Sequence, residues 1–159
     1  MSEIRIEIQG LDRQMAALRA KVDAADAAAK PVARRLALEW IQRAKLFSTG
    51  PARTGGPRRT RSGATISHRA GGPGVVTGAH RNSIAVKREL PSGVHGWQVL
   101  AGPGRPYSRR LELGFDGPDS LGRVYHQPPY PYAGPALAWT EARAHSLASS
   151  IWGDAIRAA

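Results

Sequence analysis

The sequence predicts an α+β fold in a single domain that covers residues 1–159. Apolar residues recur at helical spacing in long stretches near both ends of the chain, and two strand-like runs flank a Pro-Ser-Gly turn between them. A chain of 159 residues is also of a size that supports one hydrophobic core. We expect a long N-terminal helix and a C-terminal helix packed on a small antiparallel β-sheet, with a long basic loop.

The N-terminal region combines a short strand pattern with a long helical pattern. Residues 3–9 alternate isoleucine with polar side chains, as in a half-buried strand, and we expect this strand to pair with a neighbouring subunit. Residues 11–29 place apolar side chains at intervals of four and three, which lines one face of a helix. Because Pro31 lacks a backbone donor, we expect a kink or break there, followed by further helix over residues 32–47.

The C-terminal half predicts a hairpin followed by a final helix. Residues 83–90 and 94–101 are strand-like, and the three residues 91–93 between them suit a hairpin turn. Residues 120–130 are expected to complete the sheet. Pro135 is a good first helical residue, and apolar side chains at helical spacing follow it almost to the end of the chain.

Residues 48–76 show neither periodicity and consist largely of Gly, Pro, Ser, Thr and Arg. Connections longer than about 12–15 residues without regular structure are uncommon in compact domains and are usually functional or disordered. The net charge of +11 is concentrated around this loop, because no acidic residue occurs between Glu39 and Glu89. The arginines within the loop are Arg53, Arg58, Arg59, Arg61 and Arg69.

These five arginines predict contact with a polyanion. Guanidinium groups on a flexible backbone suit phosphate oxygens, and the loop lacks the aromatic residues that stack on the bases of single strands. Sequence-independent contact with duplex DNA is the interpretation that we favour. Two alternatives remain open, namely a segment that becomes ordered against an acidic protein surface and a solvated linker.

Enzymatic and metal-binding patterns are missing from the sequence. It contains no cysteine, no HExxH, no Gly-x-Ser-x-Gly and no phosphate-binding loop. Asp116 and Asp119 lie in a Gly-Pro turn, where we expect them to stabilise the turn. No spacing typical of metal ligands connects the histidines, which are His68, His80, His95, His126 and His145. We therefore expect no catalysis, no metal and no cofactor, and the sequence shows neither a secretory signal nor a membrane-spanning stretch.

Three short segments carry a family resemblance through their order and separation. Residues 76–84 read Val-Thr-Gly-Ala-His-Arg-Asn-Ser-Ile, residues 107–115 read Tyr-Ser-Arg-Arg-Leu-Glu-Leu-Gly-Phe, and residues 131–137 read Pro-Tyr-Ala-Gly-Pro-Ala-Leu. Together they resemble the neck or tail-component family of long-tailed double-stranded-DNA phages, which includes head–tail connector, tail completion and minor tail proteins. The matched positions are Thr77, Gly78, Arg81, Ser83, Ile84, Tyr107, Glu112, Gly114, Pro131, Tyr132, Pro135 and Ala136.

The sequence departs from the family pattern at His80, where the family usually has an apolar residue. A second departure is Arg110, where an aromatic residue is common. Glu112 lies among several arginines, so we expect either a bridge to an arginine of a neighbouring subunit or a solvated local ion pair.

The resemblance implies a structural virion protein without enzymatic activity. It implies a homo-oligomeric ring of sixfold or twelvefold symmetry in the neck of a siphovirus, synthesised in the cytoplasm of the host bacterium. Head-completion or adaptor proteins and tail-terminator proteins would flank this ring, and its basic loops would face double-stranded DNA in the lumen. Two alternatives are a tail terminator or tail completion protein and, from another class, a small cytoplasmic DNA-binding protein without sequence preference, which charge alone supports.

Overall fold

The computed structural model describes residues 10–49, 58–59, 65–66 and 78–159 of the chain. The predicted α+β class is confirmed, with long N-terminal and C-terminal helices and small antiparallel sheets. The predicted strand at residues 3–9 lies outside the described residues. In chain order the elements are α1 (Leu11–Phe47), β1 (Arg58–Arg59), β2 (Thr65–Ile66), α2 (Ala79–Ser83), β3 (Ala85–Ser92), β4 (Gly96–Gly102), α3 (Ser108–Leu113), β5 (Phe115–Pro118), β6 (Val124–Gln127) and α4 (Ala133–Ala158).

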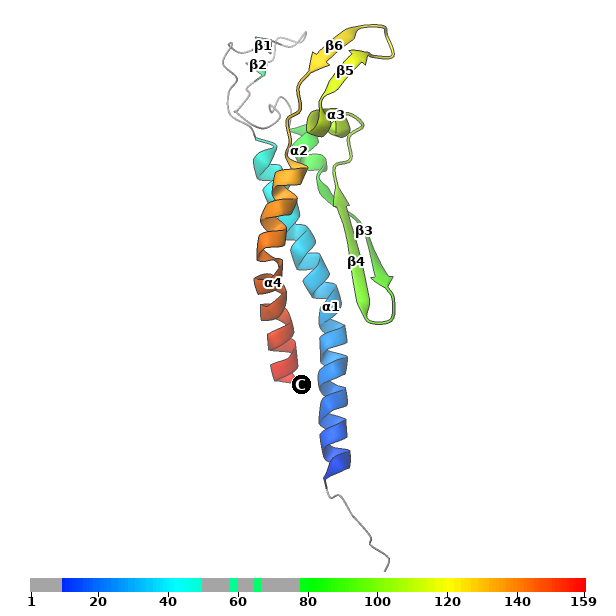
Figure 1. The fold of residues 1–159 in the computed structure, drawn as a ribbon, viewed down its shortest axis with the longest axis vertical. Helices are drawn as coiled ribbons and strands as arrows, with labels where there is room; N and C mark the ends of the chain where they lie inside the picture. Colours follow the sequence, from blue (N-terminus) through cyan, green and yellow to red (C-terminus); the bar gives the residue numbers. More distant parts are fainter. Residues whose placement is uncertain (1–9, 50–57, 60–64, 67–77) are drawn as a thin grey trace, which may run out of the picture.

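Helix α1 is one helix of 37 residues that contains Pro31 in its interior. Of the two outcomes expected at this proline, a break is wrong, and Figure 1 shows that the helix changes direction between its dark-blue and cyan halves. An interior proline removes one helical hydrogen bond and costs about 3 kcal/mol. Ala28 and Val32 are buried on either side of Pro31, so tertiary packing on this face offsets that cost and keeps the helix continuous.

Helix α4 packs against α1 in the antiparallel direction (Figure 1). The indole Nε1 of Trp40 donates to the carbonyl oxygen of Ala133 at 3.3 Å near the start of α4. The indole Nε1 of Trp152 donates to the carbonyl oxygen of Ala25 at 3.1 Å near its end. We expected both helices to pack on a sheet. Instead, the pair of strands β3 and β4 covers one side of α1 and helix α4 covers another (Figure 1). Two strands are only about as wide as one helix, so this pair is too narrow to cover both helices.

The predicted central hairpin is confirmed as the antiparallel pair of β3 and β4. Its turn lies at residues 93–95 rather than 91–93, because Pro91 pairs opposite Trp97 and extends β3. The turn is attached to α1, since the His95 Nδ1 lies 2.6 Å from the Asp26 carboxylate.

Residues 120–130 do not join the hairpin to form one sheet, and that expectation is wrong. Strands β5 and β6 form a separate antiparallel pair. Asp119 holds the turn between them, as predicted for a turn residue, because its carboxylate accepts hydrogen bonds from the backbone amides of Leu121 and Arg123. The Arg123 guanidinium that binds the same carboxylate lowers the pKa of Asp119 to about 2.

The basic segment contains one short piece of regular structure that the sequence did not predict. Strands β1 and β2 form an antiparallel pair in which Arg58 lies opposite Ile66 and Arg59 lies opposite Thr65. Apart from these strands and from Ser48 and Thr49, the predicted loop of residues 48–76 lies outside the described residues.

The main hydrophobic core is small and lies toward the C-terminal end of α1. Ile41 and Ala44 of α1 pack with Ile84, Tyr132 and Ala136, and all five residues are buried. Full burial of a side chain such as Ile84 contributes about 1.5–3 kcal/mol, so much of the packing energy is concentrated at this end of the molecule. Three of the family-matched positions, Ile84, Tyr132 and Ala136, belong to this core.

Candidate functional site

The three segments that carry the family resemblance meet at one place in the fold. We call this place the junction and define it by Trp40, His80, Ser108, Glu112 and Tyr132. These residues come from α1, α2, α3 and the residue that precedes α4. Residues that are twenty or more positions apart in the sequence are thereby brought into direct contact.

Glu112 binds the beginning of helix α4. Its Oε2 accepts hydrogen bonds from the backbone amides of Tyr132 at 2.8 Å and Ala133 at 2.9 Å, and its Oε1 accepts one from Gly134 at 2.9 Å. The first amides of a helix lack partners within the helix and carry partial positive charge, which favours a carboxylate at this position. Neither expected role of Glu112, a bridge to a neighbouring subunit or a solvated ion pair, describes these contacts.

His80 occupies the centre of the junction and is partly buried. Its Nδ1 lies 3.1 Å from the Ser108 hydroxyl, and its ring packs edge-on against the Tyr132 ring with centroids 4.7 Å apart. Its Nε2 is buried and has no hydrogen-bond partner among the described residues. Burial lowers the pKa of His80, and the negative charge of Glu112 opposes that shift in part. The histidine is therefore neutral in the folded protein at neutral pH.

Tyr132 is 2% exposed and anchors the chain immediately before α4. Burial, with a smaller contribution from the charge of Glu112, raises the pKa of Tyr132 to about 12. Its hydroxyl therefore remains protonated. The hydrogen bond between the Tyr132 and Ser108 side chains links α3 to the start of α4.

Two matched glycines are required by the backbone. Gly78 precedes α2 with φ 70°, and Gly114 follows α3 with φ 77°, a left-handed region that favours glycine. At Gly114 a Cβ would lie 2.7 Å from the carbonyl oxygen of Gln127, so close approach of the backbone to β6 adds a second constraint.

Three of the remaining matched positions, Ser83, Ile84 and Ala136, have structural roles in the described part of the chain. Ile84 and Ala136 are buried in the core, and the Ser83 hydroxyl donates to the carbonyl oxygen of His80 at 2.7 Å. Tyr107 immediately precedes α3. Arg81 lies in α2, Pro131 in the segment before α4, and Pro135 in the first turn of α4. Thr77 lies outside the described residues.

The predicted DNA-facing arginines are only partly described. Arg58 and Arg59 form β1, whereas Arg53, Arg61 and Arg69 lie outside the described residues. The chain enters this basic segment from Thr49, next to the buried Ser48 at the end of α1, and leaves it at Gly78, before α2. Because α1 and α2 are in contact, both ends of the segment lie beside the junction.

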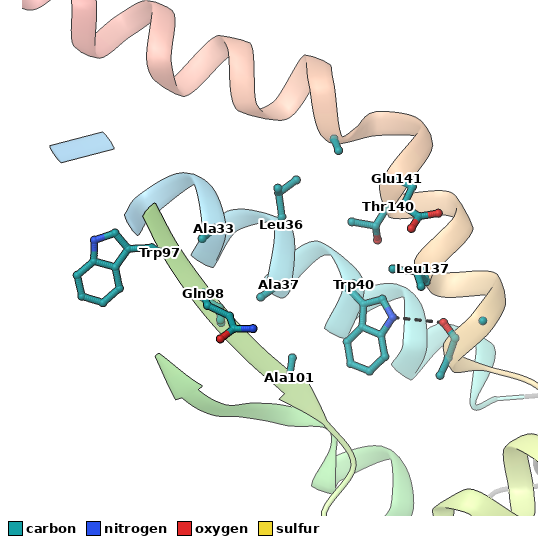
Figure 2. Close-up of a pocket in the computed structure, with 14 residues that line it drawn as sticks. Ala33, Leu36, Ala37, Trp40, Trp97, Gln98, Ala101, Leu137, Thr140 and Glu141 are labelled. Carbon is teal, nitrogen blue, oxygen red and sulfur yellow. Dashed lines mark hydrogen bonds between the residues drawn. The ribbon is translucent and has the colours of Figure 1, made fainter. Parts of the chain in front are cut away.

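A second feature, which the sequence analysis missed, is an apolar trough of about 640 Å³. Helix α1 forms its floor through Ala33, Leu36, Ala37 and Trp40. Figure 2 shows one wall from β4, with Trp97, and the opposite wall from α4, with Leu137 and Glu141. Sequence spacing indicated that these side chains are apolar, but the trough requires three elements that are distant in the sequence.

Within the described residues, no three histidine or acidic side chains are grouped closely enough to bind a metal ion. None of the described helices is both long and apolar enough to span a membrane. His95 and His126 instead form single contacts with Asp26 and Asp116, respectively.

Comparison of the chain with family models, with curated proteins and with solved structures gave no match. The resemblance to phage neck and tail components therefore depends on the three segments and their spacing alone.

We predict that replacement of Glu112 destabilises the fold. Glu112→Ala should lower the free energy of unfolding by about 2–4 kcal/mol and Glu112→Gln by about 1–2 kcal/mol, because three amides at the start of α4 lose a charged acceptor. Chemical denaturation measures both changes. Asp154→Asn is the control, since Asp154 pairs with Arg157 and both side chains are largely exposed, where an ion pair contributes little to stability. Equal effects of Glu112→Gln and Asp154→Asn would contradict this role.

We also predict that His80 makes stability depend on pH. The folded state lowers the pKa of His80 below its ordinary value of 6.5, so the unfolded chain binds a proton first as pH falls. The contribution is fully present above pH 6.5 and is lost as pH falls toward the folded-state pKa, by up to about 1.4 kcal/mol per pH unit. His80→Leu should reduce this slope, measured by denaturation between neutral and acidic pH, whereas His145→Leu at an exposed position should retain it.

Proposed function

We propose that this protein is a structural subunit of the head–tail connector of a tailed phage. In this role several copies form a ring that joins the DNA-filled head to the tail, and the basic segment of each copy faces the DNA. The chain would act through its surfaces and its charge, without catalysis.

The observation that carries this proposal is the convergence of the three family-like segments at the junction. Glu112, from the second segment, binds the first amides of α4, from the third segment. His80, from the first segment, contacts both Ser108 and Tyr132. Positions that were matched by pattern alone therefore depend on one another physically, which is the behaviour expected of a shared structural motif rather than of chance punctuation.

The charge distribution supports the part of the proposal that concerns DNA. The chain between Glu39 and Glu89 carries only basic charge, and the described residues on the two sides of its arginine-rich segment, Thr49 and Gly78, lie beside the junction. In a ring, each copy would add its arginines to one shared surface. Such a surface binds phosphate without reading sequence, as a channel for DNA requires.

A tail terminator or tail completion protein is a neighbouring possibility with the same architecture. Charge also favours a different class, a small cytoplasmic protein that binds DNA without sequence preference as a monomer or dimer. A connector subunit is part of the virion, whereas a cytoplasmic DNA-binding protein is not. Our proposal is that the chain is part of the virion.

Imaging of the phage particle that carries this chain tests the proposal directly. Cryo-EM of particles in which the chain bears a C-terminal label should place the label in a closed ring between head and tail. A label at the far end of the tail tube, or particles that lack the chain, would contradict the proposal. A stable monomer that binds DNA tightly and is missing from particles would favour the cytoplasmic DNA-binding class.

We predict that the basic segment makes DNA retention depend on salt. Changing Arg53, Arg58, Arg59, Arg61 and Arg69 to Gln should flatten the plot of log affinity against log salt by about 0.9 for each arginine that contacts a phosphate. Retention of duplex DNA of random sequence, measured over a series of salt concentrations, provides the slope.

The matched control removes the same charge from exposed residues elsewhere, namely Arg13, Arg88, Arg105, Arg109 and Arg157. This control should leave most of the slope intact. If both variants lower the slope equally, or if deletion of residues 53–69 leaves it unchanged, the basic segment is not the surface that faces DNA.

A further inference from the structure

The N-terminal part of α1 carries an apolar stripe that no described element covers. Leu11 is 50% exposed, Met15 is 43%, Leu18 is 58% and Val22 is 56% exposed. Figure 1 shows that this dark-blue part of α1 extends beyond the C-terminal end of α4. We call residues 11–22 the overhang.

The overhang stripe continues the face of α1 that the rest of the molecule uses for packing. The same intervals of four and three residues lead from Val22 through Ala25, where Trp152 of α4 is bound, to Val32, which is buried. Leu36 is the next position on this face and lies in the floor of the trough. One face of α1 therefore packs inside the molecule along part of its length and is uncovered along the overhang.

One wall of the trough matches the overhang stripe in length, and the lining of the trough is largely apolar. Its α4 wall extends from Ala133 to Ala144, which is about 17 Å along a helix, and the overhang stripe from Leu11 to Val22 has the same length. Ala33 and Ala37 in the floor are small, and small side chains allow a second helix to approach closely.

Charge at the edges of the two surfaces is complementary. Glu141 is the only charged side chain among the residues that line the trough. Lys21 flanks the overhang stripe on one side, where the overhang has no acidic residue, whereas Arg19 on the other side shares its edge with Asp12. A basic edge of the overhang would therefore meet the acidic edge of the trough.

We infer that the overhang of one copy docks into the trough of a second copy of this chain. The overhang cannot fill the trough of its own molecule, because both belong to the one continuous helix α1 and are separated along its axis. Docking buries apolar side chains on both partners, which is the main favourable contribution to association.

This contact joins two different surfaces, so a docked pair retains a free overhang at one end and a free trough at the other. Such heterologous contacts propagate and form a ring where the rotation between copies closes. The inference extends the proposed connector function. It rests on that function for the closure of the ring and for the position of the ring in the virion. It supplies the surface by which one subunit holds the next.

Complementation between two variants of the full-length chain tests the inference. Leu18→Glu damages the overhang and leaves the trough intact, whereas Leu137→Glu, at a 50% exposed position, damages the trough and leaves the overhang intact. Each variant alone should self-associate about tenfold to a hundredfold more weakly than the unchanged chain in sedimentation or light scattering. A mixture of the two should form pairs of one copy each and no larger species, since only one intact overhang and one intact trough remain.

Leu46→Glu is the matched control, because Leu46 is 55% exposed on α1 and lies outside both surfaces. This variant should associate as the unchanged chain does. Circular dichroism of every variant shows whether the helices are retained. A folded Leu137→Glu chain that still pairs would mean that overhangs bind each other, which overturns the inference, as would an unchanged chain that remains monomeric at high concentration.

The outcomes for this contact and for the proposed function are separable. A label found in a closed neck ring, with association unaffected by either variant, would reject the docking contact and leave the connector function standing. Complementation of the two variants in solution, with no label in the neck, would support the contact and reject the connector function.

Discussion

The fold depends on the contact between the Glu112 carboxylate and the backbone amides of Tyr132, Ala133 and Gly134, where α4 begins. A long helix that begins next to a buried core has amides without helical partners, and these must be satisfied where water is scarce. Glu112 satisfies them from α3, so the positions of α3 and α4 are fixed relative to each other. Trp40 binds the carbonyl oxygen of Ala133 in the same turn and extends the constraint to α1.

The junction compensates for a small core. Among the described residues few large side chains are fully buried, and the two-stranded sheets provide little surface for the helices to cover. Polar contacts with defined geometry, such as the approach of Ser108 to His80, therefore contribute to the unique arrangement of the short elements. This arrangement has a cost at His80, whose Nε2 is buried without a hydrogen-bond partner among the described residues. An apolar residue at this position would pack without the desolvation of a polar ring.

The basic and the apolar surfaces of the molecule lie at opposite ends of helix α1. The basic segment leaves from the end that carries the junction, whereas the apolar overhang lies at the opposite end of α1. A subunit that bound its neighbour through the apolar overhang and DNA through the basic segment would hold both without competition between them. This division agrees with the proposed connector, in which contact between copies must be specific and contact with DNA must not be.

The sequence by itself determined the α+β class, the helical face of α1, the central hairpin and the turn at Asp119, because each follows from local periodicity or turn chemistry. Only the tertiary structure decided the continuity of α1 through Pro31, the packing of α4 on α1, the separation of the two hairpins and the role of Glu112. Packing of Ala28 and Val32 offsets the local cost of the proline, and the partners of Glu112 lie about twenty residues away. Local sequence patterns do not predict such distant contacts. The junction and the trough therefore form only through long-range packing and hydrogen bonding.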